Sequence, residues 1–373
     1  MSNGRRLFVI DGKKIGKEGK KMPAVKLLHQ ASSSNSKPEY IRGHFFEVIG
    51  ALVQVQQKIY CLPFIARIID GFKLHEQDHS TLQERSGELL EKHFFSGSTL
   101  IADAWYAAEP FIEAIRQAGA VLITRVGKNT VAYCQAKPAD KPQRGRPRKY
   151  GDKIKLMDNF DSMTMKIAEV MNTVGKPLQV QYWQRDLLWQ SAGGFVRFVG
   201  CELREQRIIL LSTDLTMMPE DLIQSYLYRS SIETSFWYST QIFFNWAYRF
   251  WAKIPKLAPQ TTQLQEWALK EQNKFIAKLR AYEAYVLIGF FVQALLLYLK
   301  SKRDTRVPLA CQKIYWFRRS EPTEISLATL RHELRFQLKD FFKSSLPDTA
   351  FGKFFTEHLL KLHREQELRQ NAA

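Results

Sequence analysis

Short runs of consecutive apolar residues dominate the first third of the chain. Residues 7–10 form one such run, which ends on Asp11. Residues 44–55 and 58–69 form two longer, strand-like stretches that are mostly apolar. Strands that are apolar on both faces lie in the middle of a sheet that helices cover on both sides. These runs therefore predict the central strands of a covered sheet.

Helical and strand-like patterns alternate after these runs. Residues 80–95 carry leucines at helix-compatible spacings, and residues 100–102 form an apolar run that Asp103 ends. A short helical pattern then precedes the strand-like residues 121–124. This alternation favours a mixed α/β sheet over a sandwich or a helical bundle.

The pattern changes beyond Val126. A basic, proline-containing loop and several short β-like pieces predict a β-rich insertion, after which residues 207–211 return to the main sheet and a helix begins at Pro219. The chain then divides into four predicted segments: a first core part (1–125), the insertion with its basic loop (126–206), a last core part (207–258) and a C-terminal helical region (259–373).

The longest apolar stretch covers residues 285–299 and is interrupted by Gly289 and Gln293. It falls short of the ~20 residues that cross a bilayer, so it predicts a buried core helix and no membrane span. The four cysteines stand far apart without zinc-like spacing, and the first residues do not resemble a secretory signal. We therefore expect a cytoplasmic protein.

Charge narrows the class of partner. Lys and Arg number 55 against 37 Asp and Glu, which gives a formal net charge of +18. Apolar residues make up 45% of the chain, enough for a folded core, which excludes a disordered basic tail. A folded chain with this excess points to a polyanion such as nucleic acid, although a merely basic soluble protein is the alternative.

Two carboxylates end buried strands in this pattern. Asp11 and Asp103 each follow an apolar run directly. A charged side chain in such a place is costly unless something neutralises it, and strand ends are where α/β enzymes bind ligands. Two such carboxylates could share a divalent metal ion, although strand-ending aspartates also serve simply as loop caps.

A third carboxylate lies in the helix that begins at Pro219. Tyr226, Arg229 and Glu233 follow one another at positions i, i+3 and i+7, which places them within about 60° on one helical face, and Trp237 continues that face. The alternative is a surface Arg229–Glu233 pair, which contributes only a few tenths of a kcal/mol.

The motifs together resemble a known family. RLFVID at the start, LIADAWY around Asp103, RGRPRKYG in the insertion and LLSTDLTMMPEDLIQSYLYRSSIETSF are similar to an insertion-sequence DDE transposase of the fourth insertion-sequence family or a close relative. The resemblance covers residues 6–244 and extends more loosely over the helical tail.

The resemblance implies a ribonuclease-H-like α/β fold with a β-rich insertion and a C-terminal helical region. It implies that Asp11, Asp103 and Glu233 are catalytic and bind two Mg²⁺ ions, which Mn²⁺ can replace. Tyr226 and Arg229 would then contact the DNA backbone near the cut. Trp237 could stack on a base, with core packing as its alternative role.

The basic loop has two possible uses. Arg144, Arg146, Arg148 and Lys149 lie in an extended, narrow segment that could enter an A·T-rich minor groove. The alternative, which we favour, is contact with phosphates without sequence preference.

These inferences lead to one main expectation. The chain is expected to cleave transposon ends in double-stranded DNA and to join them to target DNA, as a homodimer in a bacterial, nucleoid-associated setting. The sequence differs from the family pattern at two places. Thr240 occupies the position of a lysine. Asp11 lies close to the start of the sequence, where relatives carry a DNA-binding region before the first aspartate. The alternatives are an impaired, truncated remnant that only binds DNA, or a nuclease of the same fold.

Overall fold

The computed structural model describes residues 4–19, 22–30, 38–55, 57–75, 77–93, 96–136, 148–203, 205–251, 253, 262–302, 326–335, 353 and 357. It comprises two compact units, Met1–Gln293 and Ala294–Ala373. The first unit carries the sheet, and its last helix, α6 (Leu269–Lys302), continues into the second.

The strands of the first unit are β1 (Leu7–Gly16), β2 (Lys26–His29), β3 (Tyr40–Val55), β4 (Lys58–Ile68), β5 (Phe72–Lys73), β6 (Thr99–Ile101), β7 (Val121–Val126), β8 (Val131–Gln135), β9 (Tyr150–Lys155), β10 (Lys166–Met171), β11 (Pro177–Trp189), β12 (Gly194–Leu203), β13 (Gln206–Ser212) and β14 (Thr262–Gln263). The helices that precede α6 are α1 (Leu82–His93), α2 (Glu109–Gln117), α3 (Asn159–Ser162), α4 (Pro219–Leu227) and α5 (Ser230–Gln241), with short 3-10 turns η2 (Ala104–Tyr106), η3 (Leu156–Asp158) and η4 (Gln190–Ala192).

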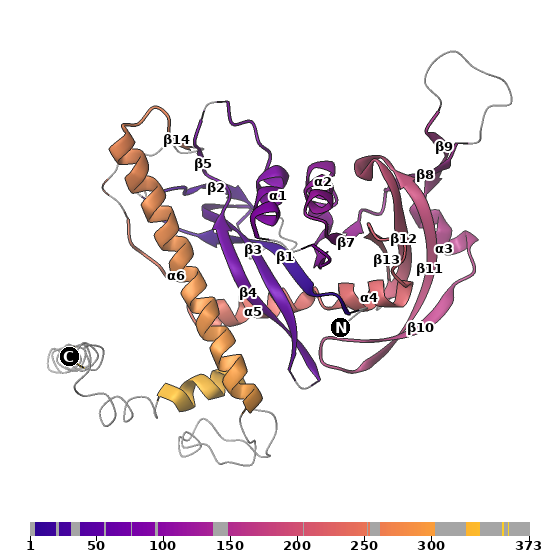
Figure 1. Ribbon diagram of the computed structural model, residues 1–373. Coiled ribbons are helices and arrows are strands. Elements are labelled where there is room, and N and C mark those ends of the chain that lie inside the picture. Colours follow the sequence, from indigo (N-terminus) through magenta and orange to yellow (C-terminus); the bar gives the residue numbers. More distant parts are fainter. Residues whose placement is uncertain are drawn as a thin grey trace. The chain divides into compact units, whose positions relative to one another are not determined.

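A 12-stranded mixed sheet forms the centre of this unit (Figure 1). Its strands follow the order β2-β3-β1-β6-β7-β13-β12-β11-β8-β9, with β4 paired to β3 and β10 to β11. β1 is antiparallel to β3 and parallel to β6, which is parallel to β7. The predicted mixed α/β sheet is thus confirmed. The runs at residues 7–10 and 44–55 supply interior strands, whereas the run at 58–69 forms β4, which pairs with β3 alone, so its prediction as a central strand is wrong.

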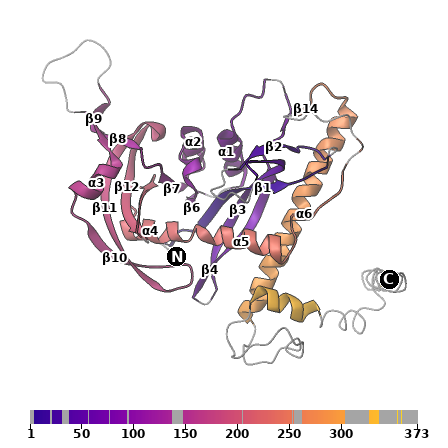
Figure 2. The same ribbon diagram turned by 180° about the vertical axis from the view of Figure 1, so that it is seen from behind.

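Helices cover both faces of the sheet. On β1, Phe8 and Ile10 pack into the cluster that includes α1 and α2, while Val9 packs into the cluster that includes α5 and α6. Alternate residues of a strand point to opposite faces, so one apolar run fills two cores. Seen from behind, α4 and α5 run end to end across the sheet (Figure 2).

The β-rich insertion is continuous with the core sheet. β13 pairs with β7 in antiparallel fashion, with Val126 opposite Ile209, as predicted for the return of residues 207–211. β12 pairs with β13, and β11 pairs with β12. Hydrogen bonds therefore extend from the core strands into the predicted β-rich insertion.

The helix that begins at Pro219 is interrupted, and the prediction of one unbroken helix is wrong. α4 ends at Leu227 and α5 begins at Ser230. Across the junction the backbone bonds join residues three apart, as in Arg229 N–H to the Tyr226 carbonyl at 3.0 Å. The Ser231 hydroxyl donates to the Tyr228 carbonyl at 2.7 Å, and such side-chain bonds compete with regular helix bonding.

The apolar C-terminal segment lies in α6 and is buried on one face only. Tyr282, Val286 and Phe290 pack into the core, while Ile288 and Phe291 are 65% and 69% exposed. The prediction of a buried core helix is therefore wrong for the second face. At 34 residues, α6 is also the one helix among the described residues that is long and apolar enough to cross a membrane. Length and composition alone do not distinguish such a span from a core helix.

Candidate active site

The two aspartates lie side by side at the ends of parallel strands. Val9 on β1 pairs with Ile101 on β6, so Asp11 and Asp103 each stand two residues beyond a paired position, on the same face of the sheet. Ile101 pairs in turn with Ile123 on β7, which gives Arg125 the equivalent place on the third strand. The sheet register thus produces a row of two carboxylates and one guanidinium.

The junction of α4 and α5 adds two charged residues above this row. The Arg229 guanidinium lies 3.5 Å from the Asp11 carboxylate and 2.6 Å from that of Glu233. Arg125 lies 3.8 Å from Asp103. The structure therefore brings Asp11, Asp103 and Glu233 to one site, where three carboxylates meet two guanidinium groups.

Local bonds fix both aspartates. The Gly12 N–H donates to the Asp11 side chain at 2.9 Å, and the Ala104 N–H donates to the Asp103 side chain at 2.6 Å. The Thr124 hydroxyl on β7 donates to the main-chain carbonyl of Asp103 at 2.7 Å. Asp103 is therefore held both by its own turn and by the neighbouring strand.

Burial and the neighbouring charges together set the protonation of Asp11. Burial raises the pKa of Asp11 to about 6, Arg229 opposes this rise, and the charges of Asp103 and Glu233 add to it. Burial also raises the pKa of Tyr226, against the opposing effect of Arg229 and Arg125. The raised pKa of Asp11 therefore reflects mainly the burial of its carboxylate, and the two neighbouring carboxylates add a smaller effect.

The donor chemistry fits a divalent cation, whereas the present spacing does not form a complete ligand cage. Carboxylate oxygens are the donors that Mg²⁺ prefers. Among the residues that the structure describes, however, no group of three or more His, Cys, Asp and Glu side chains lies close enough to hold a metal ion. Arg229 lies between Asp11 and Glu233, so joint binding of a cation requires that its guanidinium move away.

A cavity of about 590 Å³ adjoins Glu233. Its walls come from the α4–α5 junction, from β7 and from the insertion: Arg125, Asn172, Leu178, Leu203, Gln206, Ile208, Tyr226, Leu227, Arg229, Ser230 and Glu233. The lining combines apolar side chains with the charged groups of the site, which suits a ligand that has both apolar and anionic parts.

Two residues on α5 extend the site along the helix. Trp237, four positions after Glu233, is 56% exposed, so its ring is available to a ligand. Thr240 is exposed as well, and its hydroxyl donates to the Phe236 carbonyl at 2.8 Å. The position that the family resemblance assigns to a lysine therefore faces solvent.

The described part of the basic segment, Arg148 and Lys149, lies away from the carboxylates. Arg144 and Arg146 fall outside the described residues, while Arg148 and Lys149 are exposed just before β9. β9 is the last strand at the insertion end of the sheet, and Lys149 donates to the Gly193 carbonyl there. The structure does not bring Arg148 or Lys149 to the candidate active site.

The sequence argument missed Arg125 at the site and Glu47 on the opposite face of the sheet. Arg125 follows the strand-like residues 121–124 directly, and this position beside a predicted strand end was its only signal. Glu47 is fully buried on β3, and its signal was a lone acid inside an apolar run. The carboxyl of Glu47 bonds the Tyr106 hydroxyl and, at 2.7 Å, the Ser86 hydroxyl.

Comparison with known proteins gives one family match. Residues 77–187 match the model of the DDE superfamily endonucleases, a segment that contains Asp103. No curated protein matches the chain. A cryo-EM structure of a piggyBac transposase synaptic complex with hairpin DNA is similar at a TM-score of 0.37 and 10% identity, over 94% of this chain. The chain spans 56% of the length of that transposase.

For residues 77–187, the family match indicates a DDE superfamily endonuclease. The matched segment runs from the residues before α1 into β11, so it includes Asp103 and most of the insertion but neither Asp11 nor Glu233.

Proposed function

We propose that this chain is a DDE transposase, which cleaves DNA at transposon ends and joins the freed 3′-hydroxyl to target DNA. The observation that carries the proposal is the convergence of Asp11, Asp103 and Glu233 on one face of the sheet, two from neighbouring parallel strands and one from α5. The match of residues 77–187 to DDE endonucleases supports the same chemistry. The net charge of +18 suits a DNA partner.

The strand order supports a ribonuclease-H-like core. In the segment β4-β3-β1-β6-β7, β3 runs against both neighbours and the last three strands are parallel. Sheets of this kind bind ligands at the carboxyl ends of their parallel strands, where Asp11 and Asp103 lie. The finer assignment to the fourth insertion-sequence family rests on the quoted motifs.

The residues of the site have distinct roles in this proposal. Asp11, Asp103 and Glu233 would hold two Mg²⁺ ions, or Mn²⁺ in their place, and the bound ions would supply positive charge for phosphodiester cleavage. Arg229 then leaves the carboxylates and, with Tyr226, contacts the DNA backbone. Trp237 offers an exposed ring to an unpaired base.

The remaining basic residues and the assembly follow from the partner. Arg144, Arg146, Arg148 and Lys149 contact phosphates at a distance from the cut. Two copies act together as a homodimer because a transposon has two ends, each of which needs a catalytic site. The setting is the bacterial cytoplasm, where chromosomal DNA is available.

The test replaces each carboxylate by its amide: Asp11→Asn, Asp103→Asn and Glu233→Gln. Nicking of plasmid DNA and strand transfer are measured with Mg²⁺ or Mn²⁺, and DNA binding is measured in EDTA. Each amide should abolish both reactions and leave binding within about twofold, since binding depends on the basic surface. A variant with near-wild-type cleavage would remove that residue from the proposed metal site.

One observation favours a second candidate function. Thr240 replaces the lysine that the family resemblance expects at a solvent-facing position next to the site. A remnant that occupies transposon ends without cutting would bind DNA and fail the nicking assay in every metal. A nuclease of the same fold would nick but give no joined product, so the same assays separate all three functions.

A further inference from the structure

Glu47 is a fully buried acid that the proposed chemistry does not use. Glu47 lies in the middle of β3 and is 0% exposed. Burial of an ionised carboxylate is costly unless it is neutralised or fully bonded. Its two oxygens contact the Tyr106 hydroxyl and, at 2.7 Å, the Ser86 hydroxyl. A buried acid with two specific partners calls for a structural or functional reason.

The position of Glu47 connects the two aspartates. Glu47 pairs with Gly12, the residue after Asp11, across the β1–β3 ladder. Its partner Tyr106 ends the turn η2, which Asp103 caps. The Tyr106 N–H donates to the Asp103 carbonyl at 3.1 Å. Glu47 therefore links the strand pair that carries Asp11 to the turn that carries Asp103.

The link lies on the face of the sheet opposite the candidate active site. Tyr106 belongs to the core cluster of α1 and α2, as does Ile49 two residues along β3 from Glu47. Val9, two residues before Asp11, belongs to the cluster on the other face. Glu47 thus supports the site from behind and does not reach the substrate side.

The count of protons indicates which form of Glu47 completes the network. The Ser86 hydroxyl lies 2.7 Å from Glu47 and 2.8 Å from the Leu82 carbonyl, but it has one proton to donate. If Glu47 carries a proton, it donates to Ser86, Ser86 donates to Leu82, and Tyr106 donates to the second oxygen of Glu47. Every group is then satisfied. Burial, which raises the pKa of Glu47 to about 7, favours this same form.

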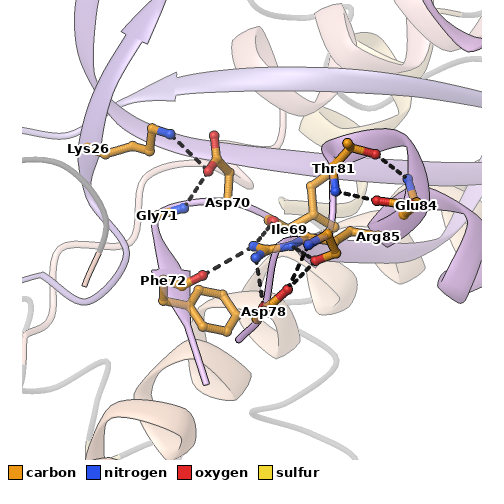
Figure 3. Close-up of polar contacts among 10 residues, drawn as sticks. Lys26, Ile69, Asp70, Gly71, Phe72, Asp78, Thr81, Glu84 and Arg85 are labelled. Atoms are coloured by element: carbon orange, nitrogen blue, oxygen red, sulfur yellow. Dashed lines mark hydrogen bonds and ion pairs between the residues drawn. The ribbon is translucent and has the colours of Figure 1, made fainter. Parts of the chain in front are cut away.

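The helix that supplies Ser86 is itself firmly anchored (Figure 3). Arg85 donates to the carbonyls of Ile69 and Phe72 at 3.0 and 3.1 Å and pairs with Asp78 at 2.9 Å. Thr81 and Glu84 bond each other's backbone N–H groups, which closes the first turn of α1. Ser86 follows Arg85 directly, so the network around Glu47 has a fixed support.

We infer that Glu47 is a positioning residue: held as a neutral acid between Ser86 and Tyr106, it fixes the turn that carries Asp103 relative to Asp11. The inference rests on the proposed function, because the spacing of the two aspartates matters for the metal ions that they would share. Partners behind metal ligands commonly change metal affinity by about 10–100-fold when they are removed.

The test compares Glu47→Gln and Tyr106→Phe with the wild type. An amide can accept from Tyr106 and donate to Ser86, so Glu47→Gln should keep the Mn²⁺ concentration for half-maximal nicking within about threefold. Tyr106→Phe removes the bond and keeps the ring, so it should raise that concentration about tenfold or more. The metal-induced rise in melting temperature gives a second readout that needs no catalysis.

Tyr182→Phe is the matched control. The Tyr182 hydroxyl also donates to a glutamate, Glu220, and Tyr182 is 4% exposed. Tyr182, however, lies on β11 in the insertion. Its removal should leave the metal dependence unchanged. Far-UV circular dichroism confirms that each variant is folded.

Three outcomes would overturn the inference: loss of nicking in Glu47→Gln like that of the triad amides, an unchanged metal dependence in Tyr106→Phe, or equal effects of Tyr106→Phe and Tyr182→Phe. The first would make Glu47 a group that acts through its charge. A wild-type chain with neither cleavage nor a metal-induced melting shift would instead overturn the proposed function.

Discussion

The guanidinium of Arg229 is shared by two carboxylates that come from distant parts of the chain. It lies 3.5 Å from Asp11 on β1 and 2.6 Å from Glu233 on α5. The sequence predicted Asp11 because it ends an apolar run, and Glu233 because it shares a helical face with Arg229. It did not predict that Arg229 would lie between the two, since the approach of α5 to β1 depends on tertiary packing.

The burial and the partners of Glu47 could not be predicted from the sequence. A lone acid within the apolar residues 44–55 can be read as a solvent-facing position, yet Glu47 is 0% exposed. Its partners Ser86 and Tyr106 lie on α1 and η2, far along the sequence. The sequence carries no pattern that would connect the three residues, because the sheet and the helix bring them together only after folding.

Glu47 also predicts how stability depends on pH. Burial raises the pKa of Glu47 from 4.5 to about 7, so the folded chain binds this proton more tightly than the unfolded chain. The contribution of this proton to the free energy of unfolding is fully present below about pH 4.5 and is lost as the pH rises through about 7. Glu47→Gln does not titrate, so relative to the wild type it should gain about 2 kcal/mol between about pH 5 and pH 8.

Urea unfolding in EDTA across this pH range measures the difference. Glu113→Gln, at a carboxylate on α2 whose side chain is 52% exposed, is the control and should give a profile parallel to that of the wild type. Parallel profiles for Glu47→Gln and the wild type would show that Glu47 is ionised in the folded chain.

Thr240 gives a prediction about DNA binding at one position. Thr240→Lys restores a cation on an exposed face of α5, so it should tighten binding to cleaved DNA ends and steepen the salt dependence by roughly one counterion. Thr234→Lys adds the same charge on another face of α5, where Thr234 is also exposed, and should change the slope less. Equal slopes for the two variants would mean that position 240 has no special relation to the DNA phosphates.

At the scale of elements, prediction worked best where burial alone decides the structure. The apolar runs at residues 7–10 and 44–55 became the interior strands β1 and β3 because such a strand needs mainly apolar residues, and the run at 58–69 became β4 beside β3. The α4–α5 junction was not predicted, since residues 219–241 keep a helical spacing across it. Serine bonds such as that of Ser231 to the Tyr228 carbonyl break the helix without changing that spacing.

Two facing glycines test how tightly β1 and β3 are joined. Gly43 pairs with Gly16, yet a Cβ at Gly43 would lie 2.0 Å from the Ile15 carbonyl oxygen, whereas a Cβ at Gly16 would meet no atom within 4 Å. Both strands are tied into the sheet and cannot separate freely. Gly43→Ala should therefore lower the free energy of unfolding by about 2 kcal/mol or more, and Gly16→Ala should change it by less than about 1 kcal/mol.

Urea denaturation of the two glycine variants checks this prediction. Equal effects would show that β1 and β3 can shift apart at this point, against the register that also sets Asp11 opposite Val48 and Gly12 opposite Glu47.

At the scale of the whole molecule, charge governs the encounter with DNA. A net charge of +18 predicts that affinity for random duplex falls linearly in a plot of log affinity against log salt concentration. If about six phosphates are neutralised, affinity should fall about a thousandfold between 50 and 200 mM salt. Fluorescence anisotropy in EDTA measures this, and an affinity that is insensitive to salt would contradict a phosphate-based interface.

The way in which β7 and β13 meet has a consequence for how the insertion joins the core. Val126, at the end of β7, stands opposite Ile209 near the start of β13, in the antiparallel register of an ordinary hairpin. The residues between them could be exchanged for a tight turn without any change in how the two strands pair. The insertion therefore leaves and rejoins the core sheet at a single place, with Asp11 and Asp103 before it in the chain and Glu233 after it.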